Sequence, residues 1–115
     1  MTRKRGDLYQ REQTRRPAVA DPVHARLQHG VRLHQLGRLA EADAAYQEAA
    51  KLAPRNPDIA NLRGLIALQS GRADLALGYF DRAVKLAGNV ADYHNNRGIA
   101  LGRLGRIADA DASFG

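Results

Sequence analysis

A spacing of 34 residues recurs through most of this 115-residue sequence, and it limits the fold more than any other feature. Glycine, alanine and aromatic residues return at that spacing in independent series of three members each. Such a period predicts a stack of small units, each of which buries its apolar face against its neighbours. The series are Gly30, Gly64 and Gly98; Gly37, Gly71 and Gly105; Ala42, Ala76 and Ala110; and Tyr46, Phe80 and Phe114.

Each unit begins with residues that are typical of a helix N-terminus. Asp21 and Asn56 each precede a proline, and an acceptor side chain followed by proline is typical of the first turn of a helix. Asn89 is expected to cap the third unit in the same way. Each unit is therefore predicted to open with a helix.

Glycines predict where these first helices end, because glycine adopts the left-handed conformation of a helix C-terminus without steric cost. A second helix is expected to follow in each unit, and in the first unit Pro54 ends it, because proline cannot continue a helix. The predicted end points are Gly37, Gly71 and Gly105, and the second helices are predicted to start at about Leu39, Ala73 and Ile107.

Small residues recur where the two helices of a hairpin have to approach each other. Gly30, Ala42 and their counterparts lack bulk at these places, and the aromatic series is expected to fill the wider space between hairpins. The apolar residues are mainly aliphatic, with no Trp and only 5% aromatic residues, which favours helices over strands. We therefore predict an all-α solenoid of antiparallel helix hairpins.

This pattern of small, aromatic and proline positions resembles the tetratricopeptide repeat. The resemblance implies a right-handed solenoid. Residues 1–22 are richer in charge, Gln and Thr than the repeats, so we expect them to form a basic, disordered arm. It departs from the family before the first glycine of each unit, where His29, Arg63 and Arg97 stand in place of the usual leucine. The predicted parts are the arm at 1–22, repeats at 23–56 and 57–90, and an incomplete repeat at 91–115.

The third unit stops at Gly115, inside its predicted second helix, and no polar capping helix follows. The end of a solenoid normally needs a polar cover, because the last hairpin has no neighbour against which to bury its apolar face. We expect that further repeats or another domain follow, or that self-association through the uncapped C-terminal end covers this face.

The distribution of charge argues against nucleic acid as a partner. The formal net charge is +6, and residues 1–22 contribute six basic and three acidic side chains to it. The remaining residues are nearly balanced, with twelve basic and nine acidic side chains. They lack the excess of basic side chains that phosphate binding needs.

The composition also bears on the compartment. The absence of cysteine excludes a disulfide framework and a thiolate metal site. No apolar run approaches the roughly 18 residues that cross a bilayer, and polar residues follow the basic N-terminus where a signal peptide would be apolar. We predict a cytoplasmic protein with no membrane segment.

No combination of residues predicts catalysis. His24, His29 and His34 are five residues apart, which turns successive side chains by about 140° around a helix, whereas helical metal pairs are three or four apart. The two serines lack the context of a nucleophile, and the glycines lack that of a phosphate loop. We therefore predict that the chain is not an enzyme and binds no metal or cofactor.

The resemblance further implies that the first helix of each repeat lines a concave groove. On that face an apolar stripe is flanked by amides and charges, which can bond the backbone of an extended or helical peptide. We predict a scaffold for protein–protein interaction that binds a peptide segment or a partner helix there. The predicted groove residues are Leu27, Val31, Gln35, Asp58, Asn61, Leu65, Gln69, Asp92, Asn95, Ile99 and Arg103.

Two alternative functions stay open at this point. The chain could be the N-terminal targeting module of an enzyme, such as a glycosyltransferase or methyltransferase, whose catalytic domain lies beyond Gly115. It could also bind nucleic acid through its basic arm. The branch of the family that binds chaperone tails clamps a terminal carboxylate, but Leu27, Val31 and Leu62 stand at clamp positions here, so no clamp is inferred.

Overall fold

The computed structural model describes residues 21–114, and the side chains of residues 21–106. These residues form an all-α repeat solenoid with no strand between 21 and 114, which confirms the predicted fold class. Apart from Asp21 and Pro22, the predicted arm lies outside the described residues. The helices are α2 (Pro22–Gln35), α3 (Leu39–Leu52), α4 (Pro57–Gln69), α5 (Ala73–Leu86) and α6 (Ala91–Phe114).

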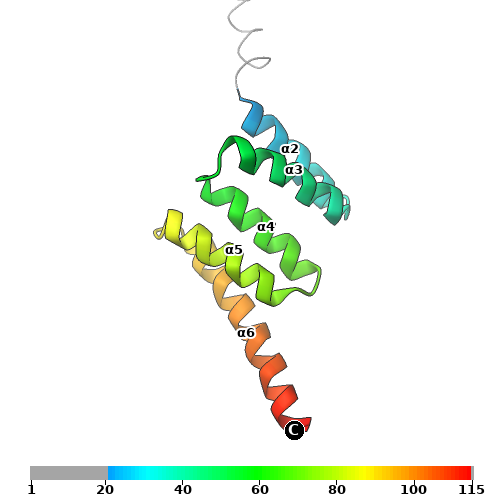
Figure 1. The fold of residues 1–115 in the computed structure, drawn as a ribbon, viewed down its shortest axis with the longest axis vertical. Helices are drawn as coiled ribbons and strands as arrows, with labels where there is room; N and C mark the ends of the chain where they lie inside the picture. The colour runs from blue at the N-terminus through cyan, green and yellow to red at the C-terminus, as the bar shows by residue number, and fades with distance from the viewer. Residues whose placement is uncertain (1–20, 115) are drawn as a thin grey trace, which may run out of the picture.

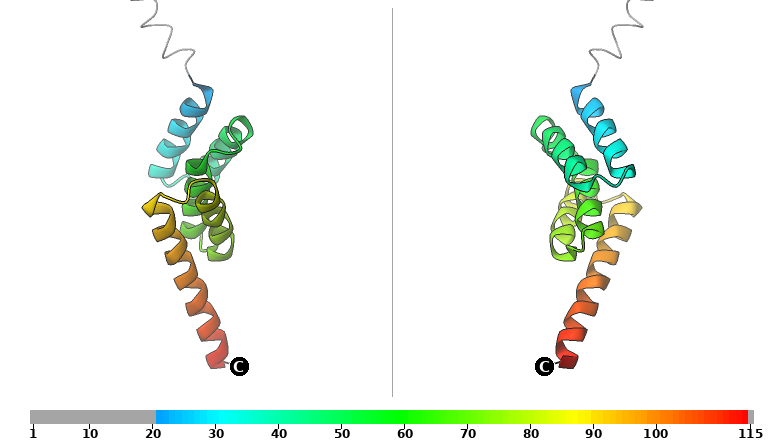
Figure 2. Two further views of the ribbon diagram at one scale, coloured as in Figure 1. Left: turned by 90° about the vertical axis from the view of Figure 1, so that its left-hand side faces the viewer. Right: turned by 90° about the vertical axis from the view of Figure 1, so that its right-hand side faces the viewer.

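Two antiparallel hairpins, α2–α3 and α4–α5, stack on each other, and α6 packs on the second hairpin and then extends beyond it (Figure 1). Side views place α2 and the start of α6 on one side of the molecule and α3 on the other (Figure 2). None of the helices in the described part of the chain is long and apolar enough to cross a bilayer.

The helix starts follow the predicted caps in the first two units. Asp21 Oδ1 accepts from the backbone N–H of Val23 at 3.1 Å, and Asn56 Oδ1 accepts from that of Asp58 at 2.9 Å. The third prediction is wrong, because α6 begins two residues after Asn89, which therefore does not hold the capping position. This unit lacks the proline that fixes the first turn in the other two.

The first two hairpin turns also follow the prediction. Gly37 and Gly71 have φ angles of 77° and 78°, the left-handed conformation that glycine adopts without strain. After Gly37, the Arg38 N–H donates to the Leu33 carbonyl at 2.9 Å, and an equivalent bond follows Gly71. These bonds satisfy carbonyl groups that the end of a helix would otherwise leave unpaired.

Helix α6 corrects the prediction for the third unit. It continues to Phe114, so Gly105 does not end a helix and no separate helix begins at Ile107. The earlier turns are held by second helices of 14 residues that pack back on the first helices. The alanine-rich segment after Gly105 has a high helix propensity, and α6 continues through it.

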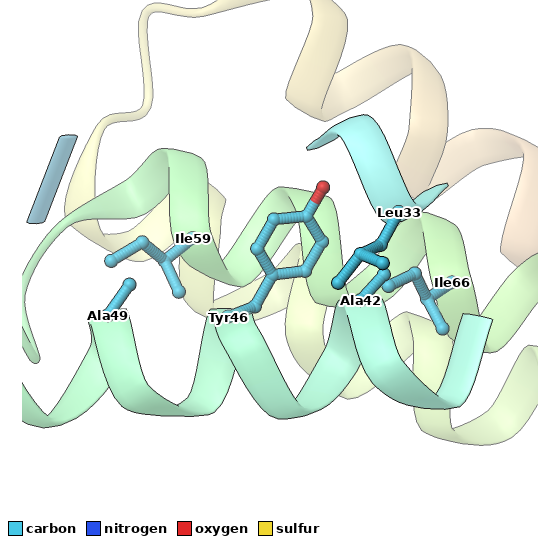
Figure 3. Packing of buried hydrophobic residues seen from close by; sticks show 6 residues of the cluster. All are labelled: Leu33, Ala42, Tyr46, Ala49, Ile59 and Ile66. Atoms are coloured by element: carbon cyan, nitrogen blue, oxygen red, sulfur yellow. The ribbon is translucent and has the colours of Figure 1, made fainter. Parts of the chain in front are cut away.

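Each hairpin is centred on one fully buried aromatic ring. Tyr46 and Phe80 are both 0% exposed, and each ring fills the space where a side chain would otherwise stand at Gly30 or Gly64. Tyr46 also belongs to a cluster that reaches the next hairpin through Ile59 (Figure 3). The ring therefore packs within its own hairpin as well as between hairpins, where the sequence predicted only the second contact.

The arginines that depart from the repeat pattern join neighbouring helices. Arg63 Nε donates to Asp43 Oδ1 at 3.0 Å, across the junction of the two hairpins. The Arg63 guanidinium also lies over the Tyr79 ring, 4.7 Å from its centroid. Arg97 pairs with Asp81 in the same manner, joining α6 to α5.

Candidate functional site

The first helices of successive units are staggered by one residue relative to the sequence repeat. Hydrogen bonds join α2 to α4 and α4 to α6 between residues that are 35 positions apart, not 34. At this offset, side chains of one first helix meet those of the next. The resulting hydrogen bonds hold α2, α4 and α6 side by side as one layer. The bonds join His34 Nε2 to Gln69 Oε1 at 2.7 Å, Asn96 Nδ2 to Asn61 Oδ1 at 2.9 Å, Arg103 Nη1 to the Leu68 carbonyl at 3.1 Å, and the Tyr93 hydroxyl to Asp58.

Four of the predicted groove residues therefore hold the layer together. Asp58, Asn61 and Gln69 each accept one of these bonds, and Arg103 donates one. The Asn61 amide still has its N–H groups, because only its oxygen is engaged. These four side chains thus have a structural role, because they bond neighbouring first helices to each other.

A groove of about 550 Å³ lies between α2 and α4. Leu27, Val31 and Leu62 are half-buried and supply its apolar part. Polar side chains surround them, and Gln28 and Gln35 are exposed. The lining residues are His24, Leu27, Gln28, Val31, Arg32, Gln35, Asp58, Asn61 and Leu62, of which Leu27, Val31, Gln35, Asp58 and Asn61 belong to the predicted set.

A second recess, of about 600 Å³, runs along α6. It contains Asn95, Ile99 and Arg103 from the predicted set, and Ile99 is 41% exposed. Basic and small residues complete it, namely His94, Gly98, Gly102 and Arg106. The face that the sequence predicts as one continuous stripe is thus divided into two hollows.

The remaining predicted residues line neither hollow. Leu65, which the sequence predicted to line the groove, is half-buried and packs against the core of the second hairpin. Gln69 and Asp92 are exposed. Sequence reasoning missed His24, Gln28, Arg32 and Leu62 as lining residues. Positions 24, 28, 31, 32 and 35 share one face of a helix, which is the signal that could have found the three on α2.

Tyr93 fastens α6 to this layer in a protonated form. Burial, the hydrogen bond to Asp58 and the charges of Asp58 and Asp92 together raise the pKa of Tyr93 to about 12. The side chain is 4% exposed. At neutral pH it therefore acts as a hydrogen-bond donor to the Asp58 carboxylate at the edge of the α2–α4 groove.

Comparison with known proteins agrees with this architecture. A family model described as the tetratricopeptide repeat matches residues 27–92. No curated protein matches the sequence significantly.

Several solved structures are similar to the fold. The first tetratricopeptide domain of Spaghetti (RPAP3) superposes with a TM-score of 0.70 at 20% identity, covering 76% of this chain and 70% of that one. The second domain of Spaghetti superposes with a TM-score of 0.70 at 20% identity, covering 80% of this chain and 85% of that one. A MamA variant superposes with a TM-score of 0.65 at 23% identity, covering 84% of this chain and 71% of that one. Since the family model spans more than half of the sequence, the chain belongs to the tetratricopeptide repeat family.

Proposed function

We propose that the groove between α2 and α4 binds a peptide segment of a cytoplasmic partner protein, without a cofactor. The observation that carries this proposal is the make-up of the groove. Half-buried Leu27, Val31 and Leu62 offer apolar contact, and exposed Gln28 and Gln35 stand beside them. An apolar hollow with polar groups at its edge suits a peptide, because apolar side chains enter it while amides bond the peptide backbone.

The similar structures support a peptide ligand. Both domains of Spaghetti were solved bound to the HSP90 peptide SRMEEVD. In this chain Leu27, Val31 and Leu62 occupy positions where chaperone-tail-binding members of the family carry clamp residues. We therefore expect recognition through apolar side chains of the peptide and not through its terminal carboxylate.

Val31 is the proposed centre of the binding surface. Val31 lines the groove, with Leu27 and Gln35 on either side of it along α2, whereas Leu65 lines neither hollow. Both side chains are half-buried and also pack against a hydrophobic core. Contacts near the centre of an interface exclude water best, and binding energy concentrates there. Replacing Val31 is therefore expected to weaken binding more than replacing a residue at the edge.

Peptides selected from a random displayed library on the purified chain would test the proposal. Val31→Asp should weaken their binding more than about tenfold, which is typical for a central contact. Gln35→Ala should cost about 0.5–1.5 kcal/mol, the net value of one hydrogen bond. Leu52→Asp is the matched control, because Leu52 is 51% exposed on α3, outside the groove.

Helical content has to be measured with binding for every variant. Binding that is lost in a folded Val31→Asp chain and kept in Leu52→Asp would support the groove. Unchanged binding by a folded Val31→Asp chain would show that peptides bind outside the groove and would contradict the proposal. Failure to select any peptide that competes at this face would also contradict the proposal.

A further inference from the structure

The first hairpin exposes a face that its counterpart in the second hairpin buries. Ile59 and Ala60 of α4 are 2% and 6% exposed, and Ile59 packs in the same cluster as Tyr46 of α3. The residues 34 positions earlier are Ala25 and Arg26 of α2, which are both exposed. The register that is covered at the junction of the two hairpins is therefore exposed on the first hairpin, at the end of the stack (Figure 1).

This outer face of the first hairpin is hollowed. A recess of about 720 Å³ lies between α2 and α3, and no residue of α4 lines it. Leu33, which is 8% exposed, lies in the recess, and the exposed Ala25 and Ala44 line it from α2 and α3. Small side chains let other helices approach closely, so the face is shaped to receive helices.

The two sides of the recess carry opposite charge. From α2 it is lined by Arg26 and His29 and by no carboxylate, and from α3 by Glu41 and Glu48 and by no basic side chain. All four side chains are exposed. Glu48 pairs with Lys51 at 3.2 Å, but an exposed pair three residues apart on one helix contributes little. Arg26 and Glu48 therefore remain available to groups from outside the hairpin.

Arg26 and Glu48 also lie at nearly the same level of the hairpin. Gly30 stands opposite Tyr46, whose ring atoms are its nearest neighbours. Because α2 and α3 are antiparallel, a residue four positions before Gly30 is level with one four positions after Tyr46. Arg26 holds the first of these positions, and Glu48 is two residues from the second, an offset of about 3 Å along the axis.

We propose that this outer face joins the chain to a second copy of itself as a two-fold symmetric dimer. A two-fold axis that runs parallel to α2 and α3, midway between them, lays α2 of one molecule on α3 of the other at the same level. Arg26 of each molecule then meets Glu48 of the other, so the ion pair forms twice. The contact uses the same surface on both molecules and closes after two copies.

A second copy matches both sides of the recess at once. A single acidic or basic helix would match only α2 or only α3, whereas the same hairpin turned by the two-fold axis brings Glu48 to α2 and Arg26 to α3. A carboxylate from α3 also meets an arginine at the junction within the chain, where Asp43 pairs with Arg63. The peptide groove stays open in this dimer, because the recess and the groove share no lining residue.

Sedimentation equilibrium of the purified chain tests the proposal. We expect a species of twice the chain mass of 12.6 kDa. Arg26→Glu and Glu48→Arg should each weaken the dimer more than about tenfold, because either change places like charges in both contacts. Both residues are exposed, so both variants should keep the helical content of the wild-type chain in circular dichroism. Lys85→Glu is the control, because it reverses an exposed charge on α5 and should leave the dimer intact.

An equal mixture of the two charge-reversed variants distinguishes this contact from any other. In a dimer of one Arg26→Glu chain and one Glu48→Arg chain, both contacts again join opposite charges, so the mixture should regain the dimer mass that neither variant keeps alone. A wild-type chain that stays monomeric up to millimolar concentration would overturn the proposal, as would a dimer that both reversals leave intact or a mixture that stays monomeric. Species larger than a dimer would also overturn it, because they require an open head-to-tail contact.

Discussion

The two closed hairpins and the third unit carry the same repeat pattern but end differently. In α4–α5 the chain turns at Gly71, and Phe80 is buried against Gly64. In α6 the chain passes Gly105 as a helix, and no residue whose side chain is described covers Gly98. Since the glycine and aromatic residues are equivalent, the difference shows that a turn in such a repeat depends on the contacts that the returning helix makes, and not on the glycine alone.

The largest expected effect comes from the aromatic series. Phe80→Ala should lower the free energy of unfolding by about 3–5 kcal/mol, because it opens a cavity in a fully buried site. Leu101→Ala on α6 should cost less than about 1 kcal/mol, since Leu101 is 43% exposed and its truncation opens no buried cavity. Urea unfolding of both variants measures the contrast, and equal losses would show that the third unit is as closed as the second.

The pH dependence of the unfolding free energy tests how Tyr93 attaches the first half of α6. The pKa of Tyr93 is raised from 10.0 to about 12 in the folded chain, so the folded state keeps a proton that the unfolded state loses. The stabilisation is complete below pH 10 and is lost as pH rises toward 12, by about 2 kcal/mol for this group.

Tyr93→Phe is the matched variant for this series. The unfolding free energy of Tyr93→Phe should be lower at neutral pH, because the variant lacks the hydrogen bond to Asp58. It should then fall less steeply than that of the wild-type chain as pH rises from 10 toward 12. Parallel pH profiles for the two chains would contradict the assigned role of Tyr93.

The smallest effect concerns the two closed hairpins themselves. Tyr46 occupies the position of Phe80, but its buried hydroxyl has no hydrogen-bond partner in the described part of the chain. Tyr46→Phe removes that unpaired group and should raise the unfolding free energy by up to about 1 kcal/mol. Thermal unfolding monitored by circular dichroism tests this, and a clear loss of stability would mean that the hydroxyl has a partner, such as an ordered water.

Most of the architecture was predictable because it depends on local chemistry. The caps at Asp21 and Asn56 and the turns at Gly37 and Gly71 use residues whose side chain or backbone freedom suits those positions. The third turn was not predictable from the same signals. Gly105 has the right identity, but the energy of the turn comes from distant contacts that a sequence repeat does not report.

The groove was only partly predictable for a related reason. A repeat of 34 residues aligns positions in the sequence, whereas neighbouring first helices contact each other at an offset of 35. Leu65 lies outside both hollows, whereas Gln28 and Arg32 line the groove beside Val31. The apolar and amide character of the face follows from the sequence, but its exact membership depends on how the helices pack.

Amide hydrogen exchange tests the central contrast most directly, because it reports the opening free energy residue by residue. The account predicts the slowest exchange in α4, which lies between α3 and α5, and faster exchange for the amides of residues 101–106 of α6, whose side chains are mostly exposed. Protection of residues 101–106 equal to that of α4 would contradict it, since this part of α6 would then be held as firmly as the core of a closed hairpin.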